Sequence, residues 1–358
     1  MASAIKLGCA AIVLMFISNL QQCVIGAPQV PCYFIFGDSL ADDGNNNALP
    51  ALAKANYPPY GIDFPKGPTG RFTNGETVFD IITKLLGFDN YIPPFAIAGA
   101  SDFLKGLNYA SGAAGILSET GRTQGARISL YEQIVNHELT VKRISAKLGS
   151  VDSATRYLNK CLYTVGIGNN DYLNNYFLPQ YYGTSRLYNP SQYARVLVRE
   201  YAKQLRILLD NGATKIALFG LGSIGCIPYA TTSFPVNSNT GCVENFNHAA
   251  QLFNDNLKSL VDELNTNSTD AKFIYVNVSG ITPNVSGFTV FNSGCCQVIN
   301  TTGLCIPFRT PCKNRSEYVF WDSFHPTQAW NQKIAPRTYN ASEPSDAYPY
   351  DISHLVQS

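Results

Sequence analysis

Three residues near the two ends of the chain could together transfer an acyl group through a serine. Ser39 lies in the segment Phe36-Gly37-Asp38-Ser39-Leu40, and His325 ends the segment Asp322-Ser323-Phe324-His325. A serine hydroxyl is a weak nucleophile unless a base accepts its proton, and a carboxylate can hold an imidazole in the orientation that this requires. We therefore expect Ser39 to be the nucleophile, His325 the general base and Asp322 the group that orients the imidazole.

Two further segments could supply hydrogen-bond donors for the oxyanion that forms during acyl transfer. Gly112 ends Asn108-Tyr109-Ala110-Ser111-Gly112 and would offer its backbone N–H, and Asn170 in 168–171 would offer its side-chain amide. The loss of one such donor typically slows a reaction ~100- to 1000-fold. Each residue also has an ordinary structural use: Ser39 as a cap, Gly112 in a tight loop and Asn170 in a turn.

The choice of His325 as the base rests on where the four histidines of the chain lie. His137 and His248 fall in amphipathic helices, where we expect a place on the helix surface or at the edge of the core. His354 lies in a terminal segment that we expect to be poorly ordered. His325 follows Asp322 by three residues, a spacing that puts two side chains on the same side of a turn. A structural His325 and a helix-capping Asp322 are the alternatives.

Strand-like and helix-like segments alternate along the chain, which predicts an α/β fold with a mainly parallel sheet and helices on both faces. The carboxyl ends of parallel strands meet at one edge, so Ser39 and Asn170, which follow apparent strands, should lie there. The long segments 45–72 and 288–313 are expected to be binding loops, or loops that are held by disulfides and cover the site. The expected strands are 32–36, 107–110, 160–166, 215–221, 272–278 and 318–321, and the expected helices are 77–86, 129–148, 190–209, 246–264 and 326–339.

The composition favours a single large domain without a polyanionic partner. The 358 residues are 45% hydrophobic and the net charge is +1, so nucleic acid is not an expected ligand. The 21 tyrosines and 20 phenylalanines would suit an apolar or aromatic small-molecule substrate. The chemistry described above needs no metal and no cofactor, and the sequence does not indicate an oligomeric state.

The first 26 residues are typical of a secretory signal peptide, which leaves 27–358 as the expected single domain. Lys6 precedes the apolar stretch 7–17, and the small residues Gly26 and Ala27 follow. An N-terminal membrane anchor is the alternative, but the stretch is short for a helix that must cross a bilayer with about 20 apolar residues. We expect an extracellular protein, in the apoplast or cell wall, with the vacuole left open.

The cysteines agree with export. Ten are present, and without Cys9 and Cys23 of the signal segment eight remain, an even number that indicates disulfides. Cys226 and Cys242 flank a loop rich in Pro, Ser, Asn and Gly, so we expect them to pair. The cluster of Cys295, Cys296, Cys305 and Cys312 resembles a stapled loop more than a zinc site, because no histidine lies nearby before His325.

Six N-x-Ser/Thr sequons lie in the C-terminal third of the chain and mark possible glycosylation sites. Asn277 falls in an expected strand and is the least suitable of them. The five remaining candidates are Asn267, Asn284, Asn300, Asn314 and Asn340.

The motifs taken together resemble the plant GDSL esterase/lipase family of the SGNH hydrolase superfamily, over essentially the whole mature chain. The resemblance rests on the four segments above, with 70–75, 220–228 and 318–326 in addition. It implies a flavodoxin-like three-layer α/β/α sandwich, and an exported enzyme that cleaves carboxylic esters through an acyl-enzyme. It also implies a catalytic triad of Ser39, His325 and Asp322, and an oxyanion hole made by Ser39 N–H, Gly112 N–H and the Asn170 side chain.

Three other functions remain to be distinguished. An acyltransferase would use the same acyl-enzyme with an alcohol in place of water. A dinucleotide-binding oxidoreductase could use the G-x-G-x-x-G motif at 220–225, although Cys226-Ile227-Pro228 does not begin a convincing helix there. A non-catalytic exported binding protein could retain the fold without turnover.

Overall fold

The computed structural model describes residues 27–236, 239–281 and 286–358. The expected signal peptide at 1–26 and the sequon at Asn284 therefore lie outside the described residues. Within the described part of the chain, no helix combines the length and hydropathy that a membrane crossing needs.

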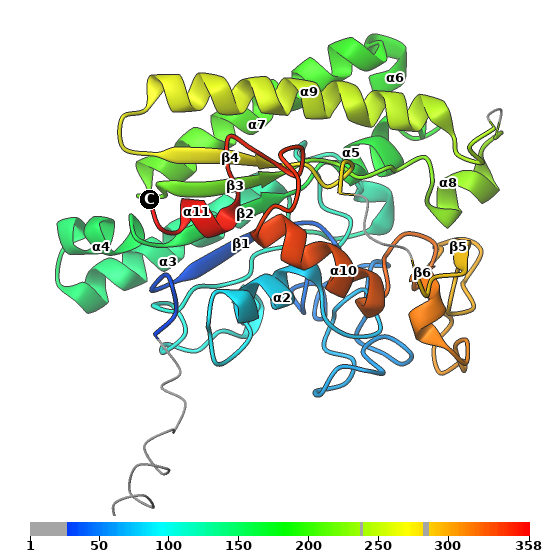
Figure 1. Ribbon diagram of the computed structural model, residues 1–358, viewed down its shortest axis with the longest axis horizontal. Coiled ribbons are helices and arrows are strands. Elements are labelled where there is room, and N and C mark those ends of the chain that lie inside the picture. Colours follow the sequence, from blue (N-terminus) through cyan, green and yellow to red (C-terminus); the bar gives the residue numbers. More distant parts are fainter. Residues whose placement is uncertain (1–26, 237–238, 282–285) are drawn as a thin grey trace, which may run out of the picture.

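A five-stranded sheet forms the centre of the molecule (Figure 1). Its strands have the order β1, β2, β3, β4 and β7; the first four are parallel, and β7 is antiparallel to β4. The parallel strands are continuous apolar runs because both faces of the sheet are covered. Their bounds, with that of β7, are β1 (Tyr33–Gly37), β2 (Leu162–Gly166), β3 (Lys215–Phe219), β4 (Lys272–Val276) and β7 (Ala347–Tyr348).

The segment 107–110, expected to be a strand, runs alongside β1 without becoming one. Ile35 N–H donates to Leu107 O at 3.0 Å, and Tyr109 N–H donates to Ile35 O at 2.8 Å. Only an isolated parallel bridge between Ile35 and Asn108 results. The segment still brings Gly112 to the carboxyl edge of the sheet, because Ser111 N–H donates to Gly37 O at 3.1 Å.

Helices cover both faces of the sheet, so the expected three-layer α/β/α sandwich is confirmed (Figure 1). The helices bury apolar side chains against the sheet. One layer holds α3 (Leu130–Leu148), α4 (Val151–Leu158), α7 (Pro190–Asp210) and α9 (Glu244–Asn267), and the other holds α2 (Val78–Leu85), α10 (Gln328–Tyr339) and α11 (Ile352–Leu355).

Shorter elements connect these layers around the carboxyl ends of the strands. β5 and β6 pair in a small parallel sheet apart from the main one. The short elements are η1 (Phe95–Ile97), η2 (Arg122–Gln124), α5 (Asn169–Asp171), η3 (Tyr172–Tyr176), α6 (Thr184–Leu187), α8 (Pro228–Ser233), β5 (Val290–Gly294), η4 (Arg315–Glu317) and β6 (Tyr318–Phe320).

Three local expectations were wrong. The last long helix begins at Gln328 rather than Pro326, because the Thr327 hydroxyl accepts from Trp330 N–H and caps it. His137 is fully buried in the core, where burial lowers its pKa to about 3 and keeps the ring neutral. The C-terminal segment is ordered as α11, which Asp351 caps and which buries apolar side chains against the sheet.

Four disulfides join the eight cysteines of the described residues. Cys226 pairs with Cys242, at a Cα–Cα distance of 4.5 Å. The cysteine cluster forms two nested bridges within 295–312, and a fourth bridge joins the residues just before β1 and β2. These other pairs are Cys295–Cys312, Cys296–Cys305 and Cys32–Cys161.

The described sequons differ in accessibility. Asn277 follows β4 directly, is half-buried, and donates through Nδ2 to Ser345 O at 2.9 Å. The side chain of Asn314 is exposed and accepts from Ser316 N–H. The exposed candidates are Asn267, Asn300, Asn314 and Asn340.

Candidate active site

Ser39, His325 and Asp322 form a hydrogen-bonded chain at the carboxyl edge of the sheet. The Ser39 Oγ lies 2.8 Å from the His325 Nε2. The His325 Nδ1 lies 2.9 Å and 2.8 Å from the two carboxylate oxygens of Asp322. Ser39 is partly exposed, whereas His325 and Asp322 are buried at 5% and 0% exposure, so solvent reaches the chain from the hydroxyl end.

The end of β1 determines where the Ser39 hydroxyl points. β1 ends at Gly37, where an added Cβ would lie 2.9 Å from Gly166 O of the neighbouring strand. The chain then turns, with Leu40 N–H donating to Asp38 Oδ1 at 3.0 Å. Asn169 Nδ2 donates to the other oxygen of Asp38 at 3.2 Å, so the serine turn is tied to the loop that carries Asn170.

The fully buried Asp322 carboxylate accepts from three donors in addition to the His325 ring. The backbone N–H groups of Phe324 and His325 each donate to Oδ1 at 2.8 Å. The Tyr60 hydroxyl donates to Oδ2 at 2.6 Å. Because burial and the charge of Asp322 both raise the pKa of Tyr60 well above its usual range, the phenol keeps its proton and donates it.

Two of the three expected oxyanion donors belong to residues that line the cavity described below, and the third already donates to a carboxylate. Among the described residues, no group accepts from Ser39 N–H. Asn170 lines the cavity; its Nδ2 donates one hydrogen to Ala114 O at 2.9 Å, and the second hydrogen remains. The Gly112 N–H instead donates to Asp42 Oδ2 at 2.8 Å, and Ala113 lines the cavity in its place.

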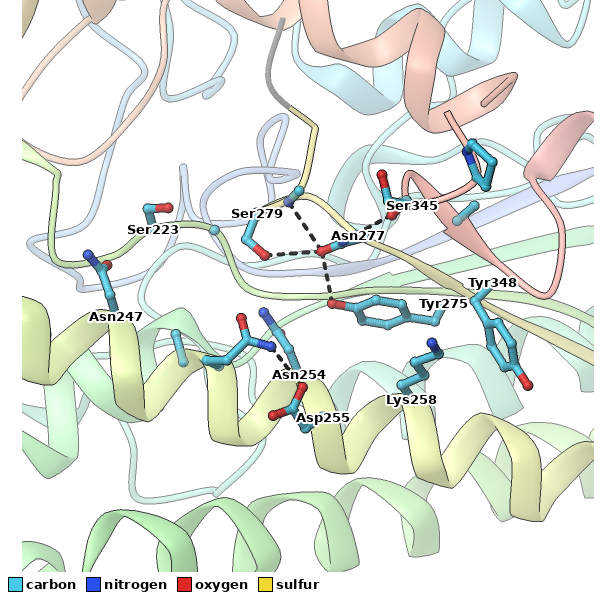
Figure 2. Close-up of a pocket in the computed structure, with 16 residues that line it drawn as sticks. Ser223, Asn247, Asn254, Asp255, Lys258, Tyr275, Asn277, Ser279, Ser345 and Tyr348 are labelled. Carbon is cyan, nitrogen blue, oxygen red and sulfur yellow. Dashed lines mark hydrogen bonds between the residues drawn. The ribbon is translucent and has the colours of Figure 1, made fainter. Parts of the chain in front are cut away.

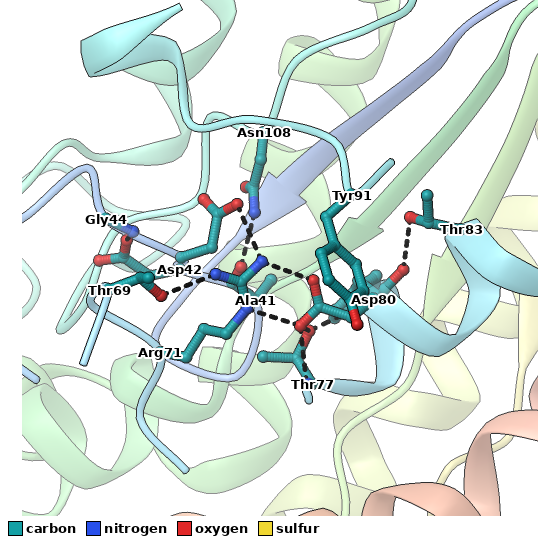
Figure 3. A network of polar contacts seen from close by, with 12 residues as sticks. Ala41, Asp42, Gly44, Thr69, Arg71, Thr77, Asp80, Thr83, Tyr91 and Asn108 are labelled. Atoms are coloured by element: carbon teal, nitrogen blue, oxygen red, sulfur yellow. Dashed lines mark hydrogen bonds and ion pairs between the residues drawn. The ribbon is translucent and has the colours of Figure 1, made fainter. Parts of the chain in front are cut away.

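The segment that follows Ser39 is anchored by buried polar side chains (Figure 3). Asn108 Nδ2 donates to Ala41 O at 2.7 Å, and Asp42 accepts from Gly44 N–H at 2.9 Å. Burial raises the pKa of Asp42 to about 6, against the backbone donors that favour its charged form. The Arg71 guanidinium makes a bidentate pair with Asp80 at 2.8 and 2.7 Å. These contacts hold the serine turn against α2.

A cavity of about 500 Å³ opens beside Ser39, His325 and Asn170. Most of its wall is apolar, and Ser39, His325 and Asn170 are among its polar lining residues, the usual pattern of a small-molecule site. We call it the apolar cavity. Its apolar lining includes Leu173, Phe219, Leu221, Ile224, Val278, Ile281, Phe291, Leu304, Phe320 and Phe324.

The dinucleotide-binding alternative lacks the helix that it requires. The G-x-G-x-x-G segment at 220–225 follows β3, but the next helix, α8, begins only at Pro228, so no helix N-terminus faces the glycines. Within the described ranges, no group of three or more His, Cys, Asp or Glu side chains could hold a metal ion.

A parallel α/β sandwich with a serine, a histidine and an aspartate beside an apolar cavity defines a hydrolase of the esterase or lipase class. The model of the GDSL-like lipase/acylhydrolase family matches residues 33–337. The chain belongs to this family and is a carboxylic ester hydrolase.

Three relatives from Arabidopsis thaliana show how much of the chain the similarity covers. GDSL esterase/lipase At4g18970 is 50% identical over 359 residues, which are 98% of this chain and 99% of that protein. GDSL esterase/lipase At1g29670 is 51% identical over 337 residues, 92% of each chain. GDSL esterase/lipase At1g29660 is 49% identical over 365 residues, covering both chains fully.

Sequence reasoning missed Tyr60 and Asp42, which contact the predicted site residues directly. Tyr60 lies in the loop 45–72, whose length indicated a binding element, but nothing local pairs it with Asp322, 262 residues away. Asp42 begins the turn Asp42-Asp43-Gly44, where its side chain accepts from Gly44 N–H, a local pattern typical of aspartate, but nothing local pairs it with Gly112.

Proposed function

We propose that the protein hydrolyses carboxylic esters with Ser39 as nucleophile, His325 as general base and Asp322 as the group that orients and charge-balances the imidazole. The observation that carries the proposal is the 2.8 Å contact between Ser39 Oγ and His325 Nε2, beside an apolar cavity large enough for an acyl group. Nucleophile, base and orienting group within hydrogen-bond reach are the signature of an activated serine.

The reaction has two halves. In the first, Ser39 Oγ forms a bond to the ester carbonyl carbon while its proton passes to His325 Nε2. The tetrahedral intermediate then expels the alcohol, which takes the proton from Nε2, and an acyl-enzyme remains. In the second, water attacks the acyl carbon, gives its proton to Nε2, and the acid leaves as Ser39 recovers that proton.

The oxyanion is stabilised by Ser39 N–H and by the second hydrogen of Asn170 Nδ2, since both residues line the apolar cavity and neither hydrogen has an acceptor among the described residues. Gly112 N–H, offered as a third donor by the family resemblance, would have to exchange the carboxylate of Asp42 for the substrate oxygen. A preorganised donor contributes because its dipole already points to the developing charge.

The experiment is a hydrolysis panel of p-nitrophenyl and natural esters. Ser39→Ala should lose at least about a thousandfold in kcat, because the nucleophile is gone, while Ser101→Ala, an exposed serine far from the site in sequence, should match the wild type. Equal rates for Ser39→Ala and the wild type would refute the serine assignment. Product analysis with glycerol present separates hydrolysis from acyl transfer, since transfer would yield the glycerol ester.

We also propose that the protein acts outside the cell, with residues 1–26 as a signal peptide and 27–358 as one exported domain. Four disulfides among the described residues support this, because such bridges persist in oxidising compartments. Exposed sequons at Asn267, Asn300, Asn314 and Asn340 agree with it. Mature N-terminal sequencing of the secreted protein would test the cleavage site.

A further inference from the structure

A second cavity, of about 510 Å³, adjoins the apolar cavity. Gly222, Ser223 and Ser279 line both, so the two spaces meet at the G-x-G-x-x-G segment and the end of β4. We call this second space the polar cleft. Figure 2 shows it between α9 on one side and β4 with the segment 344–348 on the other.

The polar cleft is lined by hydrogen-bonding side chains rather than apolar ones. Along α9, Gln251, Asp255 and Lys258 lie four, eight and eleven positions beyond Asn247, on the same face of the helix, and line the cleft. Figure 2 labels Asn247, Asp255 and Lys258. The opposite wall carries hydroxyl and amide groups together with two phenol rings. The polar lining comprises Asn247, Gln251, Asn254, Asp255 and Lys258 of α9, with Ser223, Tyr275, Asn277, Ser279, Ser345 and Tyr348.

The charges in the cleft favour a neutral occupant. Asp255 and Lys258 contribute one charge of each sign, and both side chains are exposed on the same helical face. The Lys258 Nζ lies 4.3 Å from the centroid of the Tyr348 ring. The Asp255 carboxylate would repel a phosphate group, and the Lys258 ammonium group would repel a quaternary ammonium group. Hydroxyl groups, in contrast, can form hydrogen bonds with both charged groups and with the side-chain amides.

The glycines at the junction differ in whether the surrounding atoms leave room for a side chain. A Cβ added at Gly220 would lie 2.5 Å from the Tyr275 hydroxyl, and one at Gly225 would lie 2.2 Å from Val243 O. At Gly222 the nearest atom within 4 Å would be Val278 Cγ1 at 4.0 Å. Neither packing nor a left-handed backbone demands glycine at 222, a residue that lines both cavities, and the absence of a side chain there leaves room along the wall that they share.

We propose that the polar cleft binds the hydroxyl-rich part of an ester whose apolar part occupies the apolar cavity, so that the substrates are esters of sugars or other polyols. This inference rests on the proposed function and names its substrate class. Ser39 lies in the wall of the apolar cavity, and a substrate that spans Gly222 fills both spaces. Side-chain amides, a carboxylate and aromatic rings then meet the hydroxyl groups and the apolar face of a sugar.

Binding is tested first, in Ser39→Ala protein, so that turnover plays no part. Hexyl β-glucoside, 1-hexanol and hexyl phosphocholine are titrated by calorimetry or NMR. We expect the glucoside to bind about tenfold more tightly than hexanol, as a few net hydrogen bonds allow, and Gly222→Leu to remove that advantage. Gly183→Leu is the matched control, because a Cβ there meets nothing within 4 Å and Gly183 lines neither cavity.

Turnover is tested second, as the ratio of kcat/KM for 6-O-octanoyl glucose to that for ethyl octanoate. The ratio should favour the sugar ester in the wild type and in Gly183→Leu, and should fall about tenfold in Gly222→Leu and severalfold in Lys258→Met. Circular dichroism and thermal melting show whether each variant is folded. Lys258→Met alters an exposed helical side chain and keeps the inference testable if Gly222→Leu does not fold.

The outcomes separate the two proposals. A wild type that shows no preference for the glucoside or the sugar ester, or that prefers the phosphocholine, overturns the polyol inference and leaves ester hydrolysis standing. A preference unchanged in both Gly222→Leu and Lys258→Met overturns the placement in this cleft. Tight glucoside binding without turnover of any ester supports the cleft as a polyol site and overturns the proposed function.

Discussion

At the scale of single residues, Tyr60 joins the two long loops to the carboxylate of the proposed triad. Its hydroxyl donates to Asp322 Oδ2 at 2.6 Å and accepts from Cys305 N–H at 3.1 Å. Cys305 belongs to the disulfide-stapled loop, so one phenol connects the segment 45–72, the segment 288–313 and Asp322. Tyr60 is therefore a positioning residue: it acts through Asp322 and does not contact the cavity.

Removing the Tyr60 hydroxyl tests this role. Tyr60→Phe leaves Cys305 N–H buried without its acceptor, which should lower the free energy of unfolding by about 1–2 kcal/mol. Asp322, with one donor fewer, should hold a protonated His325 more strongly, so the acidic limb of the kcat/KM profile should move to higher pH. The measurements are denaturant unfolding and the pH–rate profile.

Tyr57→Phe is the matched control for Tyr60→Phe. The Tyr57 hydroxyl donates to Cys305 O at 3.0 Å, in the same loop contact, but it makes no hydrogen bond to Asp322. It should lose some stability and keep the wild-type pH profile. Identical profiles for the two variants and the wild type would mean that the phenol of Tyr60 serves the loop alone.

At the scale of elements, the segment between α10 and β7 forms one wall of the polar cleft and depends on a buried ion pair. Asp346 accepts from Arg337 Nε at 2.9 Å and from Ser342 N–H at 3.0 Å. Burial raises the pKa of Asp346, but the Arg337 and backbone donors outweigh it, so that the pKa lies below its ordinary value. A carboxyl with a lowered pKa stabilises the fold above the unfolded-state pKa, and this contribution disappears as the pH falls through the folded-state value.

Arg337→Gln should therefore destabilise the protein in a pH-dependent way. At neutral pH we expect a loss of about 1–3 kcal/mol in the free energy of unfolding, since Asp346 stays buried without its cation. The loss should shrink as the pH falls below about 4, where the unfolded carboxyl is already protonated. Lys333→Gln, an exposed change on the same helix, is the control. A pH-independent difference between wild type and Arg337→Gln would rule out this ion pair as the cause.

Local sequence patterns predicted most of the strands and long helices that position the site. The apolar runs that end at Gly37 and Gly166 predicted β1 and β2, and therefore the edge where Ser39 and Asn170 lie. Periodicity predicted α3, α7 and α9 because each buries one continuous stripe. The start of α10 was misplaced, because the Thr327 cap outweighed the preference of proline for a first turn.

Contacts between distant segments could not be predicted in this way. The Tyr60–Asp322 and Asp42–Gly112 hydrogen bonds join residues 262 and 70 positions apart, and no local period encodes such a pairing. The buried position of His137 was missed for a related reason. Its helix packs the ring among Phe34, Phe36 and Tyr163, so a polar residue lies on a face that the pattern alone assigned to the surface or core edge.

At the scale of the whole molecule, the topology brings segments from both ends of the chain to one place. Ser39 follows the first strand, and His325 lies 286 residues later, yet their side chains are in hydrogen-bond contact. The parallel strand β1 delivers Ser39 to the carboxyl edge of the main sheet, and the loop after β6 of the small sheet brings His325 to the same place. In the proposed mechanism, ester hydrolysis depends on this long-range contact, because it brings the base to the Ser39 hydroxyl.

Labelling with a fluorophosphonate tests that activation most directly. The folded wild type should gain the mass of one phosphonyl adduct, and peptide mapping should place it on Ser39. His325→Ala, which keeps the hydroxyl and removes the base, should react at least about a hundredfold more slowly. An adduct on another residue, or equal labelling rates for His325→Ala and the wild type, would contradict the activation of Ser39 by His325.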